Sequence, residues 1–337
     1  MSDSGRPGPQ EQLTSIAATL GLGALRGAPV ALKRGTVSSW RVGTDRGELH
    51  VKVWAEAEWE WHLSALRGAA EVEAAAYGLG VEMAAPVAIN QRVGRDVVTV
   101  HRWVEGRTLA GSDDVASWVG RTLAALHTIP RPTLSPEDSL TAFYGTHSSD
   151  EWARWIDEGA EKRLPWVDAA RGALPAVMAS TEIAQEGLSA GLAVVGTHRD
   201  LHADNVLVDG GQLALVDWDY AGPDVAWFET VRAAVEFGRV AASVDGAKAD
   251  LPDDGVVRAV IREYLRSGGE EGPRGAIALA GVFAMALSRL AWQVWVSLGD
   301  RPATEGERAS AHENVGRVLA KMGPRVAAIE RLRTGVR

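Results

Sequence analysis

The stretch Gly196-Thr-His-Arg-Asp-Leu-His-Ala-Asp-Asn205 decides the fold of this chain, together with Leu213-Ala-Leu-Val-Asp-Trp-Asp219, which follows closely. The first stretch is polar and carries histidine, arginine, aspartate and asparagine side chains. The second is an apolar run that ends in aspartate and is typical of a strand. Between them, Asp209-Gly-Gly211 separates two short apolar runs, so it predicts a β-hairpin.

The spacing His198-Arg199-Asp200, followed by Asn205, is the H-R-D-x-x-x-x-N pattern of kinase catalytic loops. Phosphoryl transfer needs one carboxylate to orient and deprotonate the attacking hydroxyl. It also needs an amide oxygen and a second carboxylate to hold magnesium on the triphosphate. Asp200, Asn205 and Asp217 supply these groups within eighteen positions. A solvated loop aspartate is the ordinary alternative. A catalytic loop is favoured because five features coincide: the histidine, arginine and aspartate of the first triplet, the correctly spaced asparagine, and the aspartate at the end of the following strand.

The composition of the 337 residues is that of a soluble globular protein with one two-lobed domain or two domains, since 46% are hydrophobic and 23% charged. The formal net charge of −9 argues against a nucleic-acid partner. No cysteine is present, which excludes a disulfide framework and a thiolate metal site. The apolar run Ala276–Leu298 carries Arg289 in its interior, so we expect a buried helix, no membrane partner and a cytoplasmic protein.

A lysine on a predicted strand is the first upstream candidate. In Glu48-Leu-His-Val-Lys-Val-Trp54, strand alternation puts Lys52 on one face with His50 and Trp54. Such a lysine is most often a solvated edge residue. Because it follows a glycine-bearing turn and precedes a long predicted helix, it is also a candidate for the ammonium that binds nucleotide phosphates.

The predicted helix over residues 55–79 must supply a carboxylate if that ammonium is buried. Glu71 and Glu73 both lie near its end, and we favour Glu73 because the three alanines after it allow close packing. Strands are expected over 86–90 and 96–103. The periodicity then stops at Val104-Glu-Gly106, where a hinge with exposed amides is expected.

Helices dominate the rest of the chain. They are expected over 115–129, 225–242, 256–266, 276–298 and 305–332. The order of elements predicts an α+β fold of two lobes, a β-rich N-terminal lobe over 1–104 and a helical C-terminal lobe over 105–337. Trp152 and Trp155, at i and i+3, are expected in the core of the helical lobe.

These residues resemble the aminoglycoside phosphotransferases and related small-molecule kinases of the protein-kinase-like fold. The resemblance is strongest over residues 194–223 and weaker over 30–128. Protein kinases carry Asp-Phe-Gly, whereas here Trp218 follows Asp217, and an Ala-Pro-Glu segment is absent. The resemblance therefore implies a kinase of small molecules.

By position, the resemblance implies that Asp200 is the catalytic base and that Asn205 and Asp217 bind Mg²⁺. It further implies that Lys52 binds the α- and β-phosphates of ATP or GTP and is held by Glu73.

The same resemblance places backbone of Arg102 to Val104 against the purine. The phosphate-covering segment Lys33–Trp40 has one glycine, Gly35, so its contacts are expected from Ser38 and Ser39.

The favoured function is an ATP- or GTP-dependent O-phosphotransferase that modifies a hydroxyl of a small antibiotic of aminoglycoside, nucleoside or peptide type. A sugar or amino-alcohol kinase of metabolism is the alternative, as is a nucleotide-binding regulator without turnover. Trp292 and Trp295 beside Arg289 are candidates to stack on a ring of the acceptor. Because Ala276–Leu298 offers no carboxylate, a polycationic aminoglycoside is less favoured. A monomer or a homodimer is expected.

Overall fold

The computed structural model describes residues 8–33, 37–54, 60–110, 115–132, 140–243, 249–301 and 303–332. Close packing groups the chain into two compact units. The first comprises residues 1–109, 132–135 and 198–222, and the second comprises 110–131, 136–197 and 223–337. The predicted catalytic loop thus packs with the N-terminal strands. The lobe boundary expected between 104 and 105 stays a prediction, because close packing does not test where a lobe ends.

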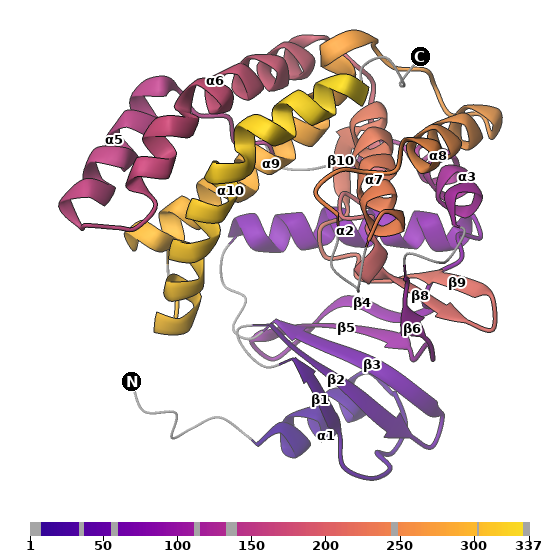
Figure 1. The fold of residues 1–337 in the computed structure, drawn as a ribbon. Coiled ribbons are helices and arrows are strands. Elements are labelled where there is room, and N and C mark those ends of the chain that lie inside the picture. Colours follow the sequence, from indigo (N-terminus) through magenta and orange to yellow (C-terminus); the bar gives the residue numbers. More distant parts are fainter. Residues whose placement is uncertain are drawn as a thin grey trace. The chain divides into compact units, whose positions relative to one another are not determined.

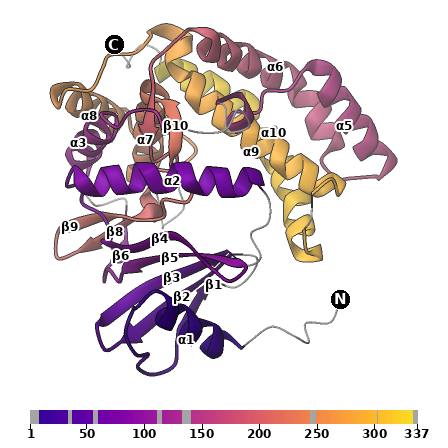
Figure 2. The ribbon, with the colours of Figure 1, turned by 180° about the vertical axis from the view of Figure 1, so that it is seen from behind.

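An antiparallel five-stranded sheet forms the centre of the first unit, in the order β1-β2-β3-β5-β4. Its strands are β1 (Val30–Lys33), β2 (Val37–Thr44), β3 (Gly47–Trp54), β4 (Pro86–Val93) and β5 (Asp96–Arg102). Helix α1 (Pro9–Thr19) covers one face and α2 (Glu60–Gly78) lies on the other side (Figures 1 and 2). Residues 34–36, which include the expected glycine of the phosphate-covering segment, lie outside the described part.

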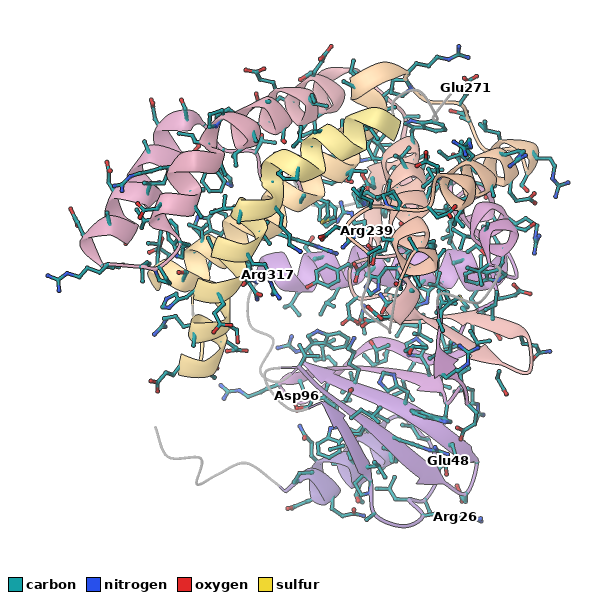
Figure 3. The ribbon with its side chains drawn as sticks, viewed as in Figure 1. Arg26, Glu48, Asp96, Arg239, Glu271 and Arg317 are labelled. Carbon is teal, nitrogen blue, oxygen red and sulfur yellow. The ribbon has the colours of Figure 1, made fainter. Side chains whose placement is uncertain are left out.

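The two faces of this sheet follow from strand alternation. Leu49, Val51 and Val53 of β3 pack with α1 in a core of buried apolar side chains. Asp96, which is labelled in Figure 3, lies at the start of β5. Its Oδ2 accepts a hydrogen bond from Gln12 Nε2 of α1 at 2.7 Å. The opposite face of β3 carries the polar residues, as the sequence predicted, so a functional surface and a hydrophobic core share one strand.

A three-stranded sheet in the first unit carries the predicted catalytic segment, with β6 (Arg107–Thr108), β8 (Val206–Asp209) and β9 (Gln212–Leu215). The β8–β9 hairpin confirms the turn signal, and the pairing runs from Val206 opposite Leu215 to Asp209 opposite Gln212. Leu215 N donates to Glu82 O at 2.8 Å. The end of the hairpin is therefore tied to the segment between α2 and β4.

The second unit is mainly helical. Its elements are α3 (Ala116–Leu126), α4 (Leu140–Phe143), α5 (Ser149–Glu161), α6 (Val167–Ser189), α7 (Ala226–Ala241), α8 (Asp254–Arg266), α9 (Ala280–Leu298), α10 (Glu305–Leu332), the 3₁₀ turn η3 (Gly275–Leu279) and the two paired strands β7 (Val194–Thr197) and β10 (Gly222–Val225). Helix α5 begins with a capping box in which Ser148 and Glu151 bond reciprocally. Trp152 and Trp155 are each 2% exposed, which confirms their core position.

Helix α9 is mostly apolar. Gly275–Leu298 is long and apolar enough to cross a membrane by length and composition alone, and half of its most apolar window is buried. The helix packs against α6, α7 and α10, with Phe283 and Leu287 each 2% exposed. This packing is that of the core helix expected from the sequence.

A buried polar cluster stabilises the second unit. Asp224 is fully buried and accepts hydrogen bonds from Tyr144 Oη at 2.7 Å and from Arg232 Nη1 at 2.9 Å. Burial opposes the charge of Arg232, but Tyr144 and Asp224 outweigh it and raise the pKa of the guanidinium. Asp224, two residues before the start of α7, therefore has a structural role as the partner of Arg232 and Tyr144.

Candidate functional site

A cavity of about 280 Å³ in the first unit contains most of the residues singled out from the sequence. Its lining includes Ser39, His50, Lys52, Glu73, Thr99, His101, Arg102, Trp103, Val104, Asn205, Asp217 and Asp219. The sheet register explains the arrangement. Lys52 pairs with Ser39 on one side and Thr99 on the other, and His50 pairs with His101, so these side chains share a face.

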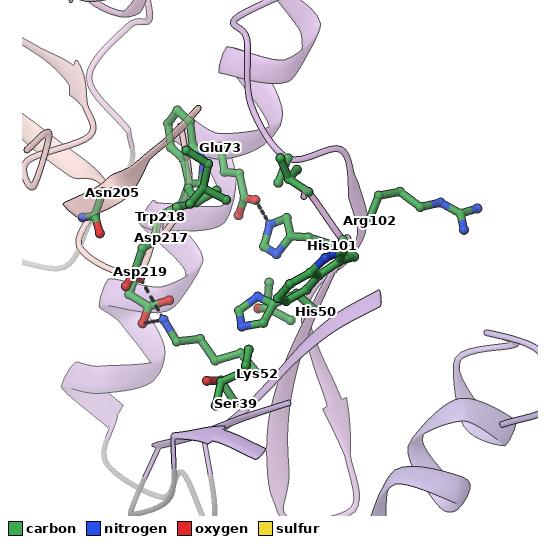
Figure 4. A pocket seen from close by; sticks show the side chains of 18 of the residues that line it. Ser39, His50, Lys52, Glu73, His101, Arg102, Asn205, Asp217, Trp218 and Asp219 are labelled. Carbon is green, nitrogen blue, oxygen red and sulfur yellow. Dashed lines mark hydrogen bonds and ion pairs between the residues drawn. The ribbon is translucent and has the colours of Figure 1, made fainter. Parts of the chain in front are cut away.

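Lys52 forms the central ion pair of the cavity. Its Nζ lies 2.8 Å from Asp217 Oδ1 and makes an even shorter contact with Asp219 Oδ2 (Figure 4). Burial would lower the pKa of Lys52, but Asp219 and Asp217 outweigh burial and raise it. The ammonium is therefore charged, although its side chain is only 11% exposed.

The two carboxylates differ in environment. Burial raises the pKa of Asp219 to about 6, although Lys52 opposes this shift. For Asp217, burial also acts upward, but Lys52 outweighs it and holds the pKa below its ordinary value. The backbone of Asp217 is left-handed, with φ of 65°, and Arg199 is too, with φ of 62°. Such strain is rare outside glycine and is concentrated at functional sites.

Glu73 does not pair with Lys52, which corrects the expectation from the sequence. Its Oε1 contacts His101 Nε2, and the carboxylate is 3% exposed. The physical reason is reach. A buried carboxylate takes the nearest donor, which is the ring at the end of β5, while the stem of Lys52 extends toward the β8–β9 hairpin. Glu71, the other candidate on α2, is exposed.

His50 is the neutral neighbour of this pair. Its ring is stacked with that of His101, with centroids 6.3 Å apart. Burial, His101 and Lys52 lower the pKa of His50 to about 4. An uncharged, half-buried imidazole therefore lies beside the ammonium. The sequence analysis gave neither histidine a role, although it placed His50 on the same face as Lys52.

Asp200 and Asn205 lie in the segment that follows β7. Asn205 Nδ2 donates to the main-chain oxygen of Asp200 at 2.9 Å and lies 3.3 Å from its Oδ2. Because a carbonyl only accepts, the amide nitrogen is assigned to this side, and the amide oxygen of Asn205 is the group left for a cation. His198 is fully buried, bonds Val216 O and packs edge-on to Trp218, so it helps to shape the loop.

His202 orients Asp200. The main-chain amide of Asp204 donates to His202 Nδ1 at 3.2 Å, so the ring proton belongs on Nε2, which lies 3.2 Å from Asp200 Oδ2. The sequence motif contained this histidine, but no role followed from spacing alone.

Replacing His202 with alanine should lower kcat roughly tenfold while the nucleotide KM stays nearly unchanged, because a loosened carboxylate loses its attack geometry. Glutamine at this position retains a donor and should restore part of kcat. Steady-state kinetics with varied nucleotide measures both parameters. A rise in KM with unchanged kcat would instead place His202 in nucleotide binding.

Of the two serines predicted to contact the nucleotide phosphates, only one lines the cavity. Ser39 lines the cavity, whereas Ser38 is outside the lining and points to the other face of β2 by alternation. The amides of Arg102 and Trp103 already donate to Ala85 O and Glu48 O, at 2.8 and 3.0 Å. A purine would thus meet the carbonyls of this segment and the amide of Val104, for which the described residues provide no acceptor.

The oxygen atoms of Asn205, Asp217 and Asp219 suit a divalent cation that enters the site bound to a triphosphate. Among the described residues, no group of three or more His, Asp or Glu side chains is arranged to hold a metal by itself. Asp217 and Asp219 nevertheless hold a stand-in cation, the Lys52 ammonium, between their carboxylates. Magnesium prefers oxygen ligands and binds through one or two carboxylates plus phosphate oxygens and water.

In the second unit, the aromatic pair suggested for the acceptor lies on α9. Trp292 is 49% exposed and its ring centroid is 6.5 Å from that of Trp295. The guanidinium of Arg301 lies over both rings, 5.6 Å from the centre of the Trp292 ring and 4.8 Å from that of Trp295. A guanidinium on these rings disfavours a polycationic ligand there.

Comparison with known proteins identifies the family of this chain. The model of the phosphotransferase enzyme family matches residues 31–266, more than half of the chain. The chain belongs to this family. A search among curated proteins found no matching sequence. The expected family resemblance and two-lobed kinase-like fold class are both confirmed.

Solved structures share the fold of this phosphotransferase at low identity. A spectinomycin phosphotransferase in complex with ADP and spectinomycin is 11% identical, with a TM-score of 0.61 over 93% of this chain and 97% of that one. A microcompartment-associated aminopropanol kinase is 18% identical, with a TM-score of 0.58 over 95% and 98%. A choline/ethanolamine kinase family protein from Mesorhizobium loti is 18% identical, with a TM-score of 0.56 over 96% and 99%.

Proposed function

We propose that this phosphotransferase transfers the γ-phosphoryl group of ATP or GTP to a hydroxyl of a small-molecule antibiotic in the cytoplasm. One observation carries the proposal: a single cavity joins Lys52 to Asp217, Asp219 and Asn205, next to an oriented Asp200. A triphosphate needs an ammonium and oxygen ligands for its metal, and its acceptor needs a carboxylate base.

In this proposal, bound Mg²⁺ neutralises charge on the transferring phosphoryl group. Asn205 and Asp217 would hold it, and Asp219 would be a further oxygen ligand. Lys52 binds phosphate oxygens, and the segment Arg102–Val104 binds the purine edge. Asp200 orients the acceptor hydroxyl and takes its proton, and His202 keeps Asp200 in place.

A metabolic amino-alcohol kinase is the second candidate, supported by the likeness to the aminopropanol and choline/ethanolamine kinases. The likeness to the spectinomycin phosphotransferase supports an antibiotic acceptor. The position of Arg301 over Trp292 and Trp295 favours an acceptor with little positive charge, because a cation already lies over those rings.

A coupled nucleotide-turnover screen separates these candidates. The panel would contain aminoglycoside, nucleoside, peptide and macrolide antibiotics together with choline, ethanolamine and aminopropanol, each with ATP and with GTP. Mass spectrometry should show one added phosphoryl group on the product. Tight nucleotide binding without turnover on the whole panel would instead favour a regulator.

A further inference from the structure

Lys52 has the same partners that the proposed metal would have. In the described part of the chain, its ion pairs are those with Asp217 and Asp219, and its ammonium also lies 5.6 Å from the centre of the Trp54 ring. Glu73, a further carboxylate of the cavity, is buried and bound to His101. The counter-ions of the phosphate-binding lysine and the ligands of the metal are thus one pair of carboxylates.

Because the lysine and the metal share these carboxylates, the binding of nucleotide alone or of metal alone has a free-energy penalty. A nucleotide without metal must draw Lys52 away from both carboxylates and then bring its phosphates close to them, so like charges face each other. A metal without nucleotide meets the Lys52 ammonium between its two carboxylate ligands. When both bind, the Lys52 ion pair is exchanged for an ammonium–phosphate pair and a metal–carboxylate pair, and no charge is left unpaired.

We infer that Asp219, together with Asp217, makes the site select the metal–nucleotide complex over the free nucleotide by holding Lys52 until both ligands are present. The inference rests on the proposed function, since it takes a nucleotide as the ligand. Asp219 has the larger part in this selection because it is 24% exposed, whereas Asp217 is 44% exposed and better solvated. Binding of metal and nucleotide is then coupled, and the coupling is reciprocal.

The nucleotide side of the coupling is tested with Asp219→Asn. Isothermal titration calorimetry would measure ADP affinity in EDTA and again in excess magnesium. In EDTA the variant should bind ADP about tenfold more tightly than the wild type, since one repelling and competing carboxylate is gone. The gain in ADP affinity on adding magnesium should shrink accordingly.

Glu73→Gln is the matched control. It removes the same charge from the same cavity, but Glu73 contacts His101 and not Lys52. The ratio of the ADP affinities with and without magnesium should stay at the wild-type value. A shift in this ratio as large as that of Asp219→Asn would attribute the coupling to the general charge of the cavity and overturn the role of Asp219.

The metal side is tested with Lys52→Met and manganese alone, with free Mn(II) followed by electron paramagnetic resonance. Without the competing ammonium, the variant should bind Mn(II) about tenfold more tightly than the wild type. Unchanged or weaker Mn(II) binding overturns the inference, as does weaker ADP binding by Asp219→Asn in EDTA. A wild type that binds no ADP under either condition overturns the proposed function, and the manganese experiment still decides whether Lys52 competes with metal. If Asp219→Asn does not fold, the manganese experiment with Lys52→Met still tests the inference.

Discussion

Replacement of Asp200 with alanine is expected to lower kcat by about a hundred- to ten-thousandfold, the usual contribution of a general base. The carboxylate is 19% exposed and is held by His202 and Asn205, so it is both accessible to an acceptor and fixed in direction. ADP affinity should stay nearly unchanged, because Asp200 is not among the residues that line the cavity.

Asp209→Asn is the matched control for this experiment, since Asp209 is an exposed aspartate at the end of β8, next to the turn of the β8–β9 hairpin. It should retain wild-type turnover. The measurement is kcat in the coupled assay together with ADP binding by calorimetry. Near-full turnover by Asp200→Ala would refute the assignment of the base, and lost ADP binding would indicate a misfolded loop.

Replacement of Arg232 with alanine is expected to destabilise the protein by about 3–5 kcal/mol, because it leaves the buried carboxylate of Asp224 without its cation. Asp224 is fully buried, and the side chain of Arg232 is 11% exposed. Tyr144 would still donate to the carboxylate but cannot neutralise it. Chemical denaturation should therefore show a large fall in the urea concentration at which half of the protein is unfolded.

Arg258→Ala offers the comparison, because Arg258 pairs with Asp254 on the surface of α8, with side chains 51% and 60% exposed. Exposed pairs of this kind contribute up to about 1 kcal/mol. The two variants remove the same side chain and the same charge, so the difference between them isolates burial. Equal effects would show that the Arg232–Asp224 pair does not stabilise the second unit.

Local sequence patterns predicted much of this protein. The hairpin followed from a turn signal, and the alternation along β3 put His50, Lys52 and Trp54 on one face, as the register of the sheet shows. The i, i+3 spacing of Trp152 and Trp155 also indicated one buried face. These features depend on neighbours a few positions apart, and backbone geometry alone relates such positions.

Partners far apart in the sequence did not follow from such patterns. Lys52 lies 165 positions from Asp217, and helical or strand periodicity says nothing about such a pair. Glu73 was paired with the wrong residue because the sequence shows that a buried carboxylate needs a donor but not which donor lies nearest. Asp219 was visible two positions after Asp217, yet its contact with Lys52 required the hairpin to be placed against the sheet.

The stretch from Gly196 to Asp219 by itself determined the reaction class and indicated the groups that we propose carry it, because phosphoryl transfer requires a base and oxygen ligands within a short reach. Tertiary structure alone decided how those groups are charged and held. It placed Lys52 between two carboxylates and gave Glu73 to His101. The reason is physical, since burial and the distance between charges set an ion pair, and both quantities exist only after the chain has folded.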